Sequence, residues 1–152
     1  MQENKAGISA KVAKYKKDVE ALSRYLIWLE SKKGEDTSAT YDPGEGKHTT
    51  LLVPTYDSTL LGFLKTAKQT AFIDRNYVYV YKRYRMETAA DELKRIDQTQ
   101  IMEIEVLGAI LSKYVLKGNT QAKLWTEGVR NGVFLALVSK MKELIEFWSS
   151  PL

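Results

Sequence analysis

The sequence contains no cysteine and only one histidine among its 152 residues. The absence of cysteine excludes disulfides, thiolate metal ligands and a cysteine nucleophile, and it agrees with a reducing compartment. A serine nucleophile would need an imidazole base beside it, but His48 stands alone next to a glycine-rich segment. A zinc site would need three or four histidine, cysteine or carboxylate ligands. We therefore predict no catalytic residue, no zinc ligand and no cofactor, and hence no enzyme activity.

Two further patterns are missing. The chain has neither GxxxxGK[ST] nor GxGxxG, so no segment predicts a nucleotide-binding loop. No apolar run approaches the roughly 20 residues that a membrane-spanning helix needs, and the lysine-rich first 17 residues contain no apolar signal-peptide core. We expect a cytoplasmic protein that does not enter a membrane.

Magnesium is the metal that carboxylates alone could hold. The acidic residues to consider are two close pairs and one single residue: Glu103 and Glu105, Asp91 and Glu92, and Asp74. Side chains two positions apart on a helix, such as Glu103 and Glu105, point to different sides. We interpret these carboxylates as solvated helix faces and predict no metal site.

Positive charge is concentrated at the start of the chain. The net charge is +4, and residues 1–33 hold 8 Lys or Arg against 4 Asp or Glu, while the remainder holds 15 of each kind. This first segment is therefore the electrostatic candidate for an acidic partner.

The same segment carries apolar residues at alternating steps of four and three: Ile8, Val12, Tyr15, Val19, Leu22, Leu26 and Leu29. This spacing predicts one long helix over residues 9–33, which Gly34 would end in a left-handed conformation. The helix either packs on its own domain, which we prefer, or forms a coiled-coil seam that would give a homodimer.

Residues 34–47 are rich in Gly, Asp, Ser and Thr and predict a flexible connector. The β-branched run at residues 48–53 predicts one short strand, ended by Pro54. Apolar residues at helical spacing fill the rest of the chain. We therefore predict a mainly α, single-domain multi-helix bundle with at most one short strand or hairpin. Its parts are an N-terminal helix (1–33), the connector (34–47) and a helical body (48–152).

Within the body, Asp57 or Ser58 can cap a helix that ends near Ala71. Helical chemistry resumes at residues 88–95, and Asp97 and Thr99 can cap a further helix. That helix would run to a stop at residue 118, and residues 120–148 would form two helices or one kinked helix.

Residues 76–85 (NYVYVYKRYR) are ambiguous. Tyr alternates with Val as in a half-buried strand, while Tyr77, Tyr81 and Tyr84 also fit one side of a helix. The local pattern alone favours a strand.

Three stretches combine apolar and glycine patterns in a fixed order: residues 55–74 (TYDSTLLGFLKTAKQTAFID), 104–119 (IEVLGAILSKYVLKGN) and 124–144 (LWTEGVRNGVFLALVSKMKEL). Over about residues 48–148 this order resembles the uncharacterised bacterial domain-of-unknown-function family 6508. The resemblance implies a glycine before a turn at Gly118 and a glycine that leads into a Leu-rich helix at Gly132. It also implies a helix at residues 76–85, which we adopt. The family has no assigned activity, so the resemblance implies a fold and no function.

The candidate interaction surface combines basic and aromatic side chains from two parts of the chain: Lys11, Lys14, Lys17, Tyr79, Lys82, Arg83 and Arg85. Tryptophans are typical anchors at interfaces, although most aromatic rings are expected to pack in the core. We predict a non-enzymatic protein-protein interaction module with an unknown protein partner. The alternative is a nucleic-acid-binding protein that uses the basic N-terminal helix and the Tyr/Arg-rich residues 77–85.

Overall fold

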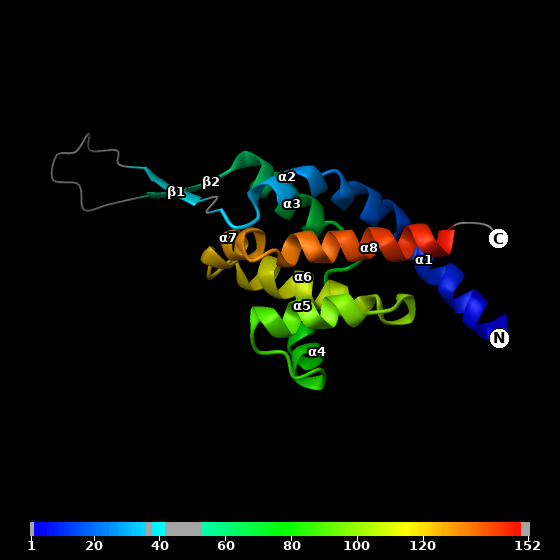
Figure 1. Cartoon of the computed structure of the whole chain (residues 1–152). Coiled ribbons are helices and arrows are strands. Elements are labelled where there is room, and N and C mark those ends of the chain that lie inside the picture. The colour runs from blue at the N-terminus through cyan, green and yellow to red at the C-terminus, as the bar shows by residue number, and fades with distance from the viewer. Residues whose placement is uncertain (1, 36–37, 42–52, 150–152) are drawn as a thin grey trace, which may run out of the picture.

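The computed structural model describes residues 2–35, 38–41 and 53–149, which form eight α-helices, one short 3₁₀ helix and a two-stranded ribbon (Figure 1). In chain order the elements are α1 (Gln2–Ser23), α2 (Leu26–Lys32), β1 (Ser38–Tyr41), β2 (Val53–Tyr56), α3 (Ser58–Lys68), α4 (Tyr77–Arg83), α5 (Ala89–Gln98), η1 (Ile101–Glu103), α6 (Glu105–Lys117), α7 (Lys123–Arg130) and α8 (Val133–Ser149). The predicted fold class, a mainly α bundle with at most one hairpin, is confirmed.

Helix α8 lies at the centre of the bundle and packs against α1, α2, α5, α6 and α7 (Figure 1). Its Phe134 is fully buried among other rings, with ring centroids 5.0 Å from Phe63 of α3 and 5.5 Å from Tyr114 of α6. Burying one side chain of this size stabilises the fold by roughly 1.5–3 kcal/mol. The apolar side of α8 therefore holds the surrounding helices together.

The predicted N-terminal helix is interrupted. Helix α1 begins at Gln2 and ends at Ser23, whose hydroxyl donates to a carbonyl one turn earlier at 2.6 Å. Tyr25 then turns its ring into the bundle and lies edge to face with Phe63, with centroids 5.5 Å apart. Because the chain bends here before α2, the prediction of one helix over residues 9–33 is wrong.

The apolar stripe of this segment is buried inside the chain. Five of its members are buried, and Ile8 and Leu26 are partly buried. Helix α1 lays the stripe against α8, which confirms that it packs on its own domain. A homodimer stays a prediction, and it would need a surface other than this stripe.

Only part of the predicted connector lies within the described residues. Gly34 has a left-handed φ of +85°, as predicted for a helix stop, and its N–H donates to the carbonyl oxygen of Arg130 at 2.8 Å. Residues 38–41 form β1 rather than irregular connector, and they pair antiparallel with β2. His48 and residues 49–52, where the strand was predicted to start, lie outside the described residues.

Strand β2 continues through Pro54, so the prediction that this proline ends the strand is wrong. Pro54 lies opposite Thr40 in the two-stranded ribbon. Each strand there is an edge strand, where a residue without an N–H is tolerated.

Several predictions for the helices of the body are confirmed. Asp57 caps α3 as predicted, with its carboxylate accepting from the N–H of Thr59 at 2.7 Å, although α3 ends at Lys68 and not near Ala71. Residues 76–85 contain α4, which confirms the helix and not the strand. Residues 120–148 form two helices, separated at Gly132, whose φ is +81°.

The predicted caps at Asp97 and Thr99 are wrong. Asp97 lies inside α5, and the Thr99 hydroxyl donates to a carbonyl one turn earlier at 2.7 Å, which ends α5 instead of starting the next helix. Helix α6 begins only after the η1 turn and ends at the predicted stop, Gly118.

The segment between α3 and α4 is held closely against α6. A Cβ atom at Gly108 would lie 2.4 Å from the carbonyl oxygen of Phe72, so only glycine fits. One turn later, the Ser112 hydroxyl accepts from the N–H of Asp74 at 2.8 Å. The Phe72 ring stacks on Tyr15 of α1 at 4.3 Å between centroids. These contacts hold the residues before α4 against α6 and α1.

We expect Gly108→Ala to lower the free energy of unfolding by about 1–3 kcal/mol, because the new methyl group meets backbone atoms. Gly7→Ala on α1 is the matched control, since its Cβ would lie 3.4 Å from the flexible end of Met102. Alanine there should be neutral or stabilise the helix by up to about 1 kcal/mol. Urea unfolding followed by circular dichroism measures both, and equal stabilities would contradict the close approach.

Candidate functional site

The predicted surface residues lie on two separate parts of the molecule. The lysines belong to α1, which runs along α8, whereas the Tyr and Arg residues belong to α4 and the residues after it. Helix α4 packs on α6 and lies at the lower end of the molecule in Figure 1, away from α1. The structure therefore does not join the two groups into one surface.

Two of the predicted α1 lysines interact with other side chains of the protein. Lys11 forms an ion pair with Glu105, at the start of α6. The Lys14 ammonium lies 5.1 Å from the ring centroid of its neighbour Tyr15. Lys17 is exposed, but Asp18 beside it accepts from the N–H of Ala71 at 2.9 Å. This helix offers scattered charges and no continuous basic face.

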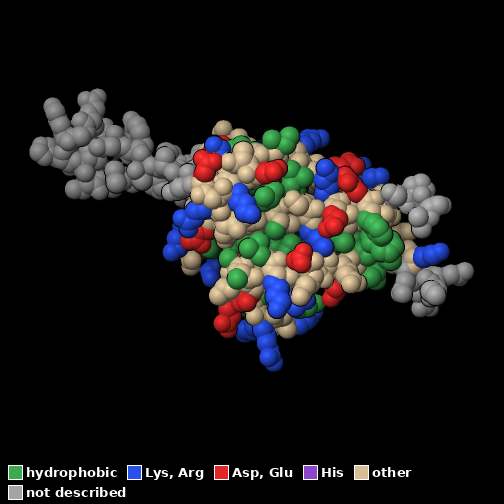
Figure 2. Space-filling model, in the orientation of Figure 1, with side chains coloured by type: hydrophobic (Ala, Val, Ile, Leu, Met, Phe, Trp, Pro, Cys, Tyr) green, Lys and Arg blue, Asp and Glu red, His purple; other side chains and the backbone are tan. Residues whose placement is uncertain are grey.

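Helix α4 has one partly buried side and one exposed side. Tyr81 is partly buried, whereas Tyr79 is 66% exposed. Lys82 and Arg83, three and four positions after Tyr79, are exposed on the same side of the helix. Figure 2 shows Lys and Arg side chains at the lower end of the molecule, where Figure 1 places α4. An exposed ring thus stands beside two cations.

The buried side of α4 meets the carboxylate of Glu92, which is 0% exposed. This carboxylate accepts from the hydroxyl of Tyr81, from the hydroxyl of Tyr114 at 2.5 Å and from the ammonium of Lys113 at 2.9 Å. The side-chain amide of Asn131 donates to the Tyr114 oxygen at 3.2 Å. These five residues, the Glu92 cluster, connect α4, α5, α6 and the turn before α8. A buried carboxylate is tolerated because it is paired and hydrogen-bonded.

The solvated helix face predicted for Glu92 is therefore wrong. Helical spacing contained the signal, because Glu92 lies three positions after Ala89 and four before Ile96, on the buried side of α5. The partners on α4 and α6 could not be found in this way, since only the packing of three helices brings them together.

Burial raises the pKa of the Tyr81 hydroxyl well above its usual value near 10, and the negative charge of Glu92 raises it further. The pKa of Tyr114 is also raised, by burial and then by its hydrogen bond to Glu92. Both hydroxyls therefore stay protonated and act as fixed donors. Hydroxyls that stay protonated and donate to Glu92 form a structural contact, and the one from Tyr81 positions α4.

A small polar pocket lies beside the Glu92 cluster, at the corner between α4 and α5. Its volume is about 220 Å³, and three of its seven lining residues are cations: Arg85, Lys94 and Arg95. Asp91 is the one carboxylate in the lining, and its Oδ2 accepts from the N–H groups of Glu87 and Thr88. These backbone hydrogen bonds lower the pKa of Asp91. We call this the α4–α5 pocket.

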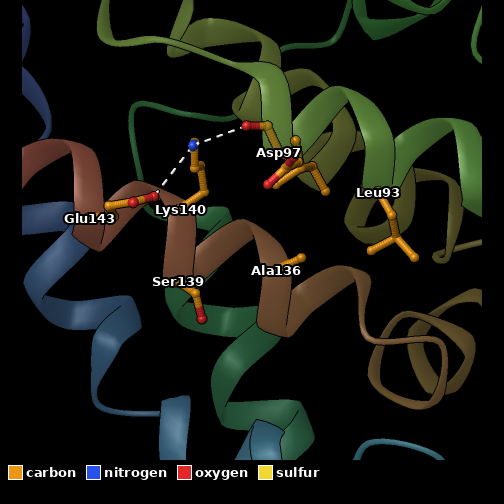
Figure 3. A pocket seen from close by; sticks show the side chains of 7 residues that line it. Leu93, Asp97, Ala136, Ser139, Lys140 and Glu143 are labelled. Carbon is orange, nitrogen blue, oxygen red and sulfur yellow. Dashed lines mark hydrogen bonds and ion pairs between the residues drawn. The ribbon is translucent and has the colours of Figure 1, made fainter.

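A larger hollow, of about 430 Å³, lies between α5 and α8 (Figure 3). Lys140 crosses one end of it, where its ammonium donates to the carbonyl oxygen of Asp97 at 3.1 Å and pairs with Glu143 at 3.3 Å. Apolar side chains, including Leu93 and Ala136, line the rest. Because Lys140 is engaged within the protein, this hollow is a poorer candidate for a charged ligand than the α4–α5 pocket.

An apolar patch covers the C-terminal end of α8, where Figure 2 shows hydrophobic side chains together. Phe147 is 69% exposed and Trp148 is 43% exposed, with ring centroids 5.1 Å apart. Phe147 borders two open hollows, one of about 550 Å³ toward Leu26 of α2 and one of about 250 Å³ toward Ile101 of η1. We call Phe147, Trp148 and these two hollows the α8 patch.

The other two tryptophans are structural. The indole N–H of Trp125 donates to the carbonyl oxygen of Val115 at 3.3 Å, and Trp28 packs against the core. Both therefore follow the expectation that most rings pack in the core. Trp148, which is exposed, is the tryptophan that remains available as an interface anchor.

No family model, curated protein or solved structure matches the chain. The resemblance to the bacterial family therefore stays a prediction. Across residues 2–35, 38–41 and 53–149, no helix is long and apolar enough to cross a membrane. In the same part of the chain, no three acidic or histidine side chains come together as a metal site would require.

The raised pKa values predict a loss of stability in alkali. The tyrosines ionise near pH 10 in the unfolded chain but not in the folded one, so stability is complete below pH 10 and falls as the pH rises further. The expected slope is about 1 kcal/mol per pH unit for each tyrosine.

Urea unfolding between about pH 8 and pH 11 measures this slope. Tyr81→Phe should give a shallower loss than the wild type, whereas Tyr79→Phe, at an exposed position, should leave the slope unchanged. Identical slopes for all three proteins would contradict the role assigned to the buried hydroxyl.

Proposed function

We propose that the protein is a non-enzymatic interaction module that binds a partner protein through the α8 patch. The observation that carries this proposal is the exposure of Phe147 and Trp148, two large adjacent rings that the core does not use. Such rings are typical hot spots, because they bury a large area at a small entropic cost. The hollows beside Phe147 offer space for side chains of the partner.

The charges around the patch indicate what kind of partner segment fits. Lys140 pairs with Glu143 at 3.3 Å, and Lys142 pairs with Glu146 at 3.8 Å. These charges cancel, so electrostatic complementarity would favour neither a strongly acidic nor a strongly basic partner. The best fit is a neutral segment that presents apolar side chains.

Site-specific photo-crosslinking in the native cells tests this surface. A photoreactive phenylalanine analogue at position 147 or 148 should give the same discrete adduct, while the analogue at the exposed Lys123 of α7, at the other end of the bundle, should not. An adduct with the mass of two chains would identify a second copy instead of a different protein. The same adducts from all three positions would contradict a specific surface.

Phe147→Ser should weaken binding of the identified partner by about thirtyfold or more, because truncating a hot-spot residue costs at least about 2 kcal/mol of binding. The free energy of unfolding should change by less than about 0.5 kcal/mol, since the side chain is exposed. Calorimetric titration with the identified partner measures the affinity. The matched control is Val78→Ser, at an exposed apolar position on α4. An equal loss of affinity in this control would contradict the assignment.

Nucleic-acid binding is the second candidate function, and the α4–α5 pocket is the observation that favours it. Three cations and one carboxylate line this pocket. The α1 lysines add little support, because Lys11 is paired and no continuous basic face forms around it. A nucleic-acid ligand would therefore use the α4–α5 corner alone. The cytoplasmic location expected from the sequence stays part of the proposal.

A further inference from the structure

We infer that the α4–α5 pocket is a binding site for one phosphate group of a single-stranded nucleic acid. This inference specifies the second candidate function and is independent of the α8 patch. It rests on the charge of the pocket, on the buried Nε of Arg95 and the left-handed backbone of Arg85, on the volume of the pocket, and on the exposed side of α4, which precedes the pocket residues in the chain.

The first argument is uncompensated positive charge. Arg85, Lys94 and Arg95 line one small pocket, and none of them forms an ion pair with a carboxylate in the described part of the chain. Asp91 is the nearby carboxylate, and one of its oxygens is already bound to two backbone N–H groups. Three cations and one engaged carboxylate leave an excess of positive charge, which an anion would relieve.

Arg95 supplies the second argument. Its guanidinium lies over the ring of Tyr84, 4.5 Å from the centroid, which fixes the direction of the side chain. Its Nε is buried and has no hydrogen-bond partner among the described residues. A buried donor without a partner is costly, and an anion bound to the part of the guanidinium that borders the pocket would offset this cost.

Arg85 supplies the third argument. Its φ is +55°, in the left-handed region, where it ends α4 while the N–H of Met86 donates to the carbonyl oxygen of Tyr81 at 3.0 Å. Glycine usually occupies this position in a helix stop because it carries no strain there. The chain instead holds a guanidinium at the edge of the pocket.

The size of the pocket and its neighbours indicate the ligand. A volume of about 220 Å³ is smaller than ordinary small-molecule sites, so it suits a single group such as phosphate, which arginine binds with two parallel hydrogen bonds. Tyr79, Lys82 and Arg83 are exposed on α4, just before the pocket residues. An exposed ring beside cations suits a stacked base of a single strand, whose next phosphate would enter the pocket.

Fluorescence anisotropy with labelled single-stranded DNA and RNA of about 12 nucleotides tests the inference across a salt series. We expect salt-sensitive binding by the wild type. Arg85→Gly, Lys94→Gln and Arg95→Gln should each weaken binding by about tenfold, and each should make the slope of log K against log salt shallower by about 0.7. Tyr79→Leu should weaken binding by about fivefold or more.

Two variants distinguish a loss of binding at the pocket from a loss of stability and from a general effect of net charge. Arg85→Gly removes the cation and also relieves the left-handed strain, so its melting temperature should equal or exceed that of the wild type. Lys142→Gln removes one charge from α8 and should leave affinity nearly unchanged.

Several results would overturn the inference. They are the absence of salt-sensitive binding, an equal loss in Lys142→Gln, and tighter binding of a duplex than of a single strand. Binding of inorganic phosphate or a phosphopeptide in the pocket without oligonucleotide binding would also reject a nucleic-acid ligand. Because none of these measurements involves Phe147, failure here leaves the α8 patch untouched.

Discussion

Burial of α8 is the constraint on which the other helices depend. Its apolar side chains contact five other helices, and Phe134 lies among rings from α3 and α6. The opposite side of α8 is exposed and mostly polar, as at Ser139, Glu143 and Glu146. Phe147 lies on this exposed side, in the last turns where Leu144 and Ile145 are still buried. The apolar patch is thus a consequence of which side of α8 faces its neighbours.

The Glu92 cluster has a different role, because it positions a helix that has little apolar packing of its own. Helix α4 has seven residues, and none of them is fully buried. The hydroxyl of Tyr81 bonds to a carboxylate that has no access to water, so this contact is costly to break. Holding the inner side of α4 in this way leaves Tyr79, Lys82 and Arg83 facing outward.

Much of the fold could be predicted because helical spacing is a local property. The stripe from Ile8 to Leu29, the cap at Asp57 and the glycine stops at Gly34 and Gly118 all needed only neighbours within a few residues. The errors arose where a distant contact decided the outcome. The break after Ser23 depends on the packing of Tyr25 against Phe63 of α3, and the buried state of Glu92 depends on α4 and α6.

The candidate sites show the same division. The sequence alone determined that the chain is mainly helical, that its charge is uneven and that aromatic and basic residues are clustered at residues 77–85, because these depend on composition and order. Only the tertiary structure decided that the α1 lysines and the α4 cations lie apart. It also decided that Arg85, Lys94 and Arg95 share one pocket and that Trp148 is the exposed tryptophan. The physical reason is that side chains meet or separate according to how helices pack, and packing joins residues far apart along the chain.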